Sequence, residues 1–210
     1  QAEILPDDVV LQVGQTVRAL QGTFRAVTIS IPAGFKVDGV TDKSGTPLSF
    51  NLPQVGKALV PLPSETSGPV DLVWQLRSTI GAGNPKVKLA PPMVDEAVRQ
   101  DGMLGVISPE GFSLRVIDGE SHGLERIGAA TFRRFADAVL RQGDSSVSHA
   151  FSFEGTCQVS LELQRVVASF LVRPSYELTI AADYAEFIAT LDLRVFRGAV
   201  ESLQFKWPKW

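Results

Sequence analysis

The sequence predicts a mainly β fold of sandwich-like antiparallel sheets with one short helical insertion. Apolar and polar residues alternate with a period of two in many short runs, as they do in strands that bury one face. Clusters of Gly, Pro, Asp and Ser separate these runs and supply turn chemistry. Hydrophobic residues make up 44% of the 210 residues and charged residues 20%, so the chain can build a sizeable core. Many short strands joined by turns are typical of a β-sandwich or a barrel.

The clearest run is PVDLVWQLR, in which Val70, Leu72 and Trp74 share one face and Asp71 and Gln75 lie on the other. Such a run predicts a half-buried strand, with Trp74 in the core. The same alternation predicts strands in FSLRVID from Phe112, TCQVSLELQRV around Cys157, YELTIAA from Tyr176 and FIATLDLRVF through Leu191.

Turn and linker signals divide the chain. The stretches TDKSGTP (residues 41–47) and SPEG (residues 108–111) carry the residues that tight turns prefer. The stretch GAGNP is the richest in small residues, and we interpret residues 81–86 as a possible linker. This predicts one β-sandwich-like module over residues 1–80 and a second β-rich module over residues 87–210.

One segment departs from the strand pattern. In residues 124–142, LERIGAATFRRFADAVLRQ, four apolar side chains recur near helical spacing: Ile127, Phe132, Phe135 and Val139. This spacing predicts an amphipathic helix, and the glycine that follows is a common helix stop.

Two segments of the chain resemble each other. GTFRAVTISIPAGF (residues 22–35) and GAVESLQFKWPKW (residues 198–210) each contain a glycine, an alternating strand, a proline and an aromatic residue. We interpret them as copies of one repeat, the second cut in mid-module, so that the chain is a part of a longer tandem-module protein. The alternative is two unrelated edge strands with similar turns.

The order of IPAGF, KVDGV and GKALVPLP, and the later GMLGVISPEGFSLRV and LDLRVF, resembles β-rich tandem modules of large uncharacterised bacterial cell-envelope proteins. The resemblance implies tandem sandwich domains that are secreted, periplasmic or in the cell envelope. It implies no assigned chemistry and transfers no functional residue to this chain. A cytoplasmic location stays open at this point.

Charge and composition exclude several functional classes. The formal net charge is −3 and no basic stripe occurs, so we expect no nucleic-acid partner. No apolar run reaches the roughly 18–20 residues of a membrane span. Cys157 is the only cysteine, and His122 and His149 are the only histidines. We therefore expect no intrachain disulfide, no metal site and no cofactor.

The candidate site residues are few, and none is assigned a catalytic role. Asp118 and Glu120 could share a face in the turn-like IDGESHG, which also contains His122. Solvated turn residues are the competing interpretation for all three. Trp210 is a candidate exposed aromatic for stacking on a sugar, with burial in the core as its alternative.

These observations favour a non-catalytic structural or interaction module over an enzyme. Its partners would be neighbouring modules of the same polypeptide or other proteins. The alternative is a carbohydrate- or peptide-binding sandwich, which predicts an exposed aromatic cluster or an open sheet edge. An enzyme would need residues from distant strands to converge in a cleft, and no spacing in the sequence indicates such a site.

Overall fold

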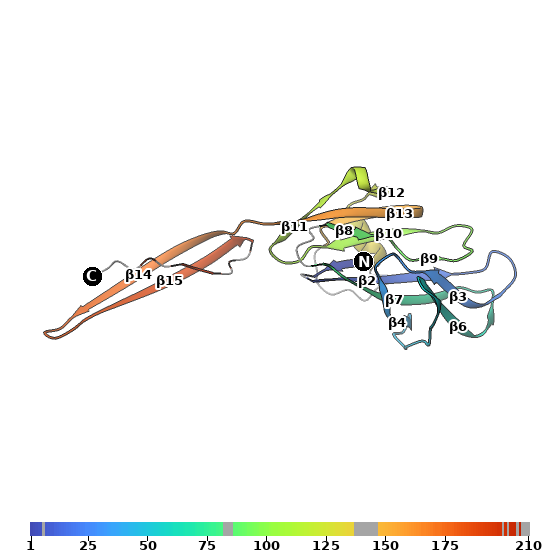
Figure 1. The fold of residues 1–210 in the computed structure, drawn as a ribbon, viewed down its shortest axis with the longest axis horizontal. Coiled ribbons are helices and arrows are strands. Elements are labelled where there is room, and N and C mark those ends of the chain that lie inside the picture. The colour runs from blue at the N-terminus through green and yellow to red at the C-terminus, as the bar shows by residue number, and fades with distance from the viewer. Residues whose placement is uncertain are drawn as a thin grey trace. The chain divides into compact units, whose positions relative to one another are not determined.

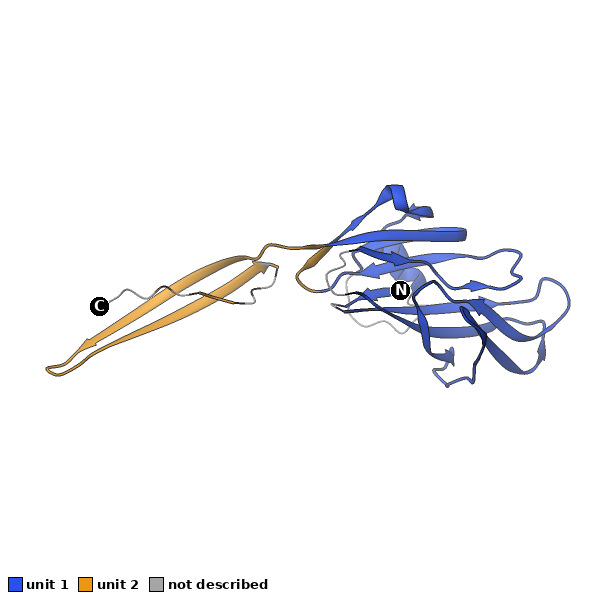
Figure 2. Cartoon of the chain, in the orientation of Figure 1, with its two compact units in different colours: residues 1–109, 114–163 blue, residues 110–113, 164–210 orange. Residues whose placement is uncertain are grey.

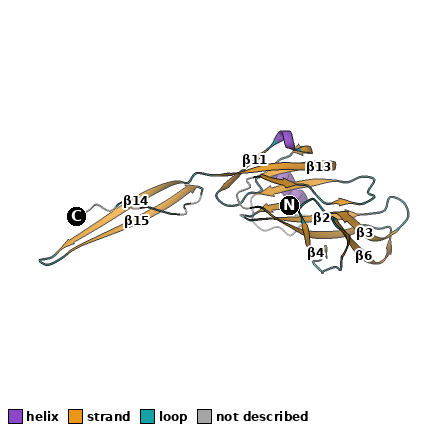
Figure 3. Cartoon of the chain, in the orientation of Figure 1, coloured by secondary structure: helices purple, strands orange, loops and turns teal. Residues whose placement is uncertain are grey.

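The computed structural model describes residues 1–5, 7–81, 86–136, 147–198, 200, 202–204 and 206. The fold is mainly β with one short α-helix, which confirms the predicted fold class (Figures 1 and 3). Two compact units are distinguished in Figure 2: residues 1–109 with 114–163, and residues 110–113 with 164–210. Most of the predicted linker, residues 82–85, lies outside the described residues, so the boundary proposed there stays a prediction.

The first unit contains a large mixed sheet. Its central path runs β11-β13-β10-β1-β2-β7-β4, and β8 and β12 also pair with β13. The pairing of β1 with β10 is parallel, whereas β2 pairs with β7 and β4 with β7 in antiparallel register. The bounds are β1 Ala2–Ile4, β2 Asp8–Val17, β4 Lys36–Asp42, β7 Val70–Thr79, β8 Lys86–Leu89, β10 Asp101–Ile107, β11 Phe112–Val116, β12 His122–Arg126 and β13 His149–Arg165.

A second, four-stranded sheet has the order β5-β6-β3-β9, and its pairs are antiparallel. Its strands are β3 Phe24–Ser30, β5 Asn51–Gln54, β6 Lys57–Thr66 and β9 Met93–Val94. One hydrophobic cluster joins Val27 and Ile29 of this sheet to Leu72 and Trp74 of β7. Two sheets that share a core between their inner faces form a sandwich.

Trp74 lies at the centre of this core and is fully buried. Leu72 and Leu76 of the same strand are buried as well, while Gln75 is exposed. The alternation read from PVDLVWQLR is therefore confirmed from Leu72 to Leu76, while Val70 and Asp71 at the start of the strand are both half-buried. Cys157 is also buried in β13, and burial raises the pKa of its thiol to about 11.

The helix begins later than predicted. Helix α1 covers Ala129–Ala136, and its buried side chains, Phe132 and Ala136, are one helical turn apart. The prediction was wrong at its start: residues 124–126 belong to β12, where Leu124 pairs with Phe153 of β13. The helix begins only after Gly128, whose carbonyl accepts the amides of Thr131 and Phe132. The predicted residues 137–142 lie outside the described part of the chain.

The second unit is dominated by one long hairpin. Strands β14 Ser169–Ile180 and β15 Ala185–Arg197 pair antiparallel along their length. A hydrogen bond from the Ala181 amide to the Tyr184 carbonyl closes the turn between them. Among the described residues, no third strand pairs with either β14 or β15.

The proposed repeat gains no support from these residues. Gly22 and Gly198 share a positive φ, 73° and 70°, as two matching turns would. However, Phe24–Ser30 forms β3, whereas residues 200, 202–204 and 206 are not in a strand. The remaining residues of the second copy lie outside the described part of the chain, so the repeat stays a prediction.

Candidate functional site

The residues singled out in IDGESHG lie on one surface loop. Asp118–Glu120 form a short 3-10 helix, η1, and His122 begins β12. Arg126 pairs with Asp118 at 3.2 Å, and Lys86 pairs with Glu120 at 3.0 Å. All four of these charged side chains are well exposed. Trp210, the remaining candidate, lies outside the described residues.

The electrostatic setting of Glu120 does not suit an acid catalyst. The hydrogen bond from Lys86 holds the pKa of Glu120 below its ordinary value, and the charges of Lys86 and Lys88 act in the same direction. A carboxyl group that donates a proton near neutral pH needs a raised pKa. Glu120 is therefore held as a carboxylate that pairs with a lysine.

Hydrogen bonds show what holds this loop in place. The Ser160 amide donates to Ser121 Oγ at 3.0 Å, and Ser160 Oγ donates to the Glu120 carbonyl at 3.1 Å. In turn the Ile117 amide donates to the Ser160 carbonyl at 2.8 Å. Because Ser160 is 1% exposed, these bonds satisfy a buried polar residue of β13. The loop is thus fixed to the sheet by the backbone of Ile117 and Glu120 and by the Ser121 hydroxyl, and the charged side chains take no part in these bonds.

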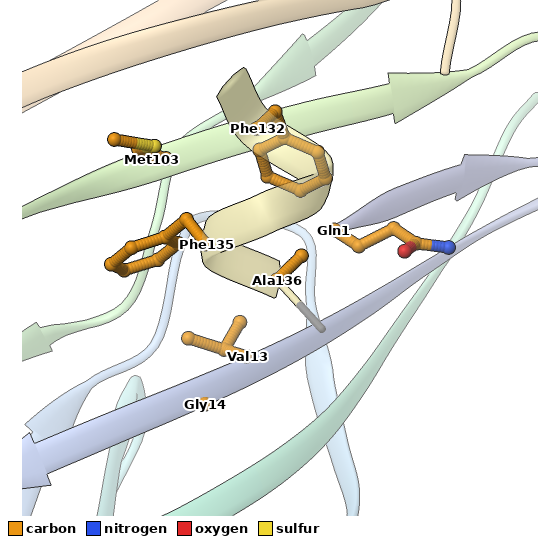
Figure 4. Close-up of a pocket in the computed structure, with 7 residues that line it drawn as sticks. All are labelled: Gln1, Val13, Gly14, Met103, Phe132, Phe135 and Ala136. Carbon is orange, nitrogen blue, oxygen red and sulfur yellow. The ribbon is translucent and has the colours of Figure 1, made fainter. Parts of the chain in front are cut away.

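A small pocket lies beside helix α1. Its lining residues, drawn in Figure 4, are Gln1, Val13, Gly14, Met103, Phe132, Phe135 and Ala136. The pocket volume is about 40 Å³, whereas sites for drug-sized ligands occupy roughly 300–1,000 Å³. The pocket has room for a few water molecules and contains no carboxylate, imidazole or thiol among these residues.

Within the described residues, no three His, Cys, Asp or Glu side chains are grouped so that they could hold a metal ion. No helix in the same part of the chain has the length and apolar character needed to cross a membrane.

The most unusual surface of the molecule is one face of the β14–β15 hairpin. From Phe170↔Val195 to Ile180↔Ala185 the register is continuous, so alternate cross-strand pairs point to the same side. On one side every residue is apolar or aromatic, and we call this side the apolar face. It consists of Phe170, Val172, Pro174, Tyr176, Leu178, Ile180, Ala185, Phe187, Ala189, Leu191, Leu193 and Val195.

The apolar face is open to solvent in this structure. The exposed fraction is 75% for Ile180, 64% for Tyr176 and 59% for Leu178. The rings of Tyr176 and Phe187 stack on each other, with centroids 5.6 Å apart and planes inclined by 24°. Soluble proteins expose isolated apolar residues routinely, but a contiguous apolar surface of this kind is a recognised mark of an interaction site.

The opposite side of the hairpin, which we call the polar face, has the composition of an ordinary solvent-facing surface. Arg173 lies directly across from Asp192, a favourable cross-strand pair. The polar face consists of Leu171, Arg173, Ser175, Glu177, Thr179, Glu186, Ile188, Thr190, Asp192 and Arg194. Since charges of both signs are confined to this side, the hairpin is amphipathic across its two faces.

Sequence reasoning found these strands but not the site. The alternation of Tyr176, Leu178 and Ile180 was correctly interpreted as a strand with one apolar face. The signal that could have indicated a site is the short spacer of four residues between the two runs, Ala181–Tyr184. Such a spacer predicts a hairpin, and a hairpin aligns two apolar faces on the same side.

No protein-family model matches this chain, and no curated protein matches it either.

Proposed function

We propose that this protein is a non-catalytic interaction module that works by burying the apolar face of the β14–β15 hairpin against another protein surface. The observation that carries the proposal is the register, which places twelve side chains without a formal charge on one side of two paired strands. The partner surface would belong to another protein or to a neighbouring module of the same polypeptide.

The hairpin gains stability when its apolar face is covered. A two-stranded hairpin by itself is marginally stable in water and needs further strands or a packed face. Burying a Leu, Ile or Phe side chain contributes about 1.5–3 kcal/mol relative to leaving it exposed. The side chains of the apolar face supply that free energy only when a second surface covers them. Folding of the hairpin and binding of its partner are therefore coupled in this proposal.

The first unit would serve as the scaffold of this module. The carboxylates of Asp118 and Glu120 pair with Arg126 and Lys86 on its surface, and the pocket beside α1 has room for a few water molecules. In line with the resemblance noted above, we place the module in a larger secreted or envelope protein, where tandem units hold such contacts in series.

Carbohydrate binding is a second candidate, because the stacked and exposed Tyr176 and Phe187 offer a flat aromatic platform. A sugar, however, also needs hydrogen-bonding groups beside the ring. On the apolar face the Tyr176 hydroxyl is the only polar side-chain group. This composition favours a protein surface over a glycan. A glycan panel monitored by tyrosine fluorescence separates the two candidates.

Site-specific photo-cross-linking in the cells that make the protein tests the proposal. A photoreactive phenylalanine analogue replaces Leu178 on the apolar face or, as the matched control, Thr179 on the polar face. We expect a protein adduct from position 178 and little from position 179. Equal labelling at both positions, or no protein adduct at 178, would contradict the proposal.

A further inference from the structure

We infer that the surface covering the apolar face is the same face of a second copy of this chain. Two hairpins would stack face to face as a four-stranded, two-layer sandwich. This inference rests on the proposed function, because it names the partner of the same surface.

The composition of the apolar face makes it self-complementary. A two-fold symmetric contact brings each surface patch against itself, so a charge at the centre would meet a like charge or need a specific partner. None of the twelve residues is charged, and the Tyr176 hydroxyl is their only polar side-chain group. Two such faces can therefore meet without leaving a buried charge unpaired.

The sizes of the side chains favour one arrangement of the two copies. Within the hairpin, two of the six cross-strand pairs of the apolar face set a large residue of β14 across from a small one of β15. These pairs are Tyr176 with Ala189 and Ile180 with Ala185. A two-fold axis along the strands places β14 of one copy over β15 of the other. Tyr176 would then lie over the partner's Ala189, and Ile180 over the partner's Ala185. Large side chains entering spaces above small ones give the interdigitated packing of a sheet-on-sheet core.

The dimensions of the face indicate how strong this contact is. Strands of twelve residues rise about 3.4 Å per residue, and two strands with their side chains are about 10 Å wide. The flat footprint is therefore roughly 400 Å² per copy, or about 800 Å² in total, to which protruding side chains add. This is below the roughly 1,200–2,000 Å² of stable specific interfaces and matches weak, transient ones, so we expect a reversible dimer with a Kd in the micromolar range or weaker.

The polar face argues against a lipid surface as the partner. Helices and other elements that lie on anionic membranes carry an excess of Lys and Arg on the side that faces water. Here Arg173 and Arg194 are outnumbered by Glu177, Glu186 and Asp192. The net charge of the polar face is therefore negative and does not attract anionic headgroups. Binding to a protein partner does not require such an attraction.

Sedimentation velocity of the 210-residue chain tests the inference. Between about 1 and 100 µM we expect the mass to rise from 22.7 kDa toward twice that value. Phe187→Lys puts a charge into the apolar face and should weaken dimerisation at least roughly 30-fold. Ile188→Lys adds the same charge at the adjacent residue on the polar face and should leave dimerisation unchanged.

Several results would overturn the inference. They are a monomer throughout the concentration range, equal effects of the two lysine variants, or binding to anionic vesicles that depends on Phe187 while the chain stays monomeric. If the chain is a monomer but still cross-links at position 178 to a different protein, the inferred dimer is wrong and the proposed function is still supported. An unchanged thermal unfolding of the first unit shows that each variant leaves that unit folded.

The arrangement of the copies has its own test. Facing sheets lie about 10 Å apart, so a bis-maleimide with a spacer of about 8 Å can join cysteines across them, whereas a disulfide cannot. A mixture of Tyr176→Cys chains and Ala189→Cys chains should cross-link faster than either variant alone. Cys157 stays out of this reaction because it is buried and its thiol pKa is about 11. Faster cross-linking within either single variant would overturn the axis along the strands.

Discussion

Strand β7 of the sandwich and strand β14 of the hairpin carry the same alternating pattern, but their apolar residues meet different surroundings. In β7, Leu72 and Trp74 are at most 1% exposed because the second sheet packs against them, and Leu76 is buried in the other large hydrophobic cluster of this unit. In β14, Tyr176, Leu178 and Ile180 are 59–75% exposed. A period-two pattern therefore predicts a strand with one apolar face. It does not predict whether that face is covered by the same chain, because this depends on how the other strands pack.

The largest expected effect comes from truncating the sandwich core. Trp74→Ala should lower the free energy of unfolding by about 3–5 kcal/mol, because it leaves a cavity between the two sheets. The equivalent truncation of the hairpin, Phe187→Ala, should leave the main transition unchanged within about 0.5 kcal/mol. Urea unfolding followed by circular dichroism measures both. Similar losses of unfolding free energy for the two variants would contradict the difference proposed between the covered face of β7 and the uncovered face of the hairpin.

Trp74→Phe sharpens this test. The Trp74 indole Nε1 is buried and has no hydrogen-bond partner among the described residues. Replacing the indole by a phenyl ring removes that unsatisfied donor while keeping most of the apolar volume. Its loss of stability should therefore be clearly smaller than that of Trp74→Ala, and an equal loss would show that the N–H has a favourable partner.

A smaller effect is expected where α1 packs on β10. A Cβ atom added at Gly105 would lie 2.4 Å from the ring of Phe132, so this ring requires a glycine beneath it. Gly105→Ala should lower stability by about 1–3 kcal/mol and reduce the melting temperature by several degrees. Gly39→Ala is the matched control in β4, because nothing lies within 4 Å of its added Cβ. Equal melting temperatures for the two variants would contradict this account of the helix contact.

The smallest effect concerns pH. Lys57 Nζ donates to Asp95 Oδ2 at 2.6 Å, and Ser30 Oγ donates to Asp95 Oδ1 at 2.7 Å. Both bonds hold the pKa of Asp95 below its ordinary value, and the bond from Lys57 has the larger effect. A lowered folded-state pKa contributes stability that is present above the ordinary pKa of 3.8 and is lost as the pH falls through the folded value. Wild type should therefore lose more stability than Asp95→Asn between pH 6 and pH 3 in urea titrations. Identical pH dependence would show that these contacts contribute nothing.

Much of the fold follows from local patterns in the sequence. Leu72, Trp74 and Cys157 are buried as their positions on apolar faces predict. The helix was misplaced at its start because the sequence of residues 124–126 is compatible with either a helix or a strand. Pairing with β13 decides between the two, and β13 is more than twenty residues away in the sequence, so a local period cannot reveal it.

The candidate site could be predicted only in part. Asp118, Glu120 and His122 were chosen for their chemistry, yet the loop that carries them is fixed by backbone bonds to the buried Ser160. The apolar face of the hairpin was visible as two alternating runs. Whether another part of the chain covers those two runs depends on how all the strands pair and pack. The alternation within a single run contains no information about this.

Hydrogen–deuterium exchange tests most directly whether the apolar face is an interaction surface. Amides of β2 and β7 should be protected at every protein concentration, because the sandwich is complete within one chain. Amides of β14 and β15 should exchange quickly at about 1 µM and become protected as the protein concentration rises. In Phe187→Lys this protection at high concentration should be absent. Protection of the hairpin equal to that of β7 at low concentration, and unaffected by Phe187→Lys, would contradict the account.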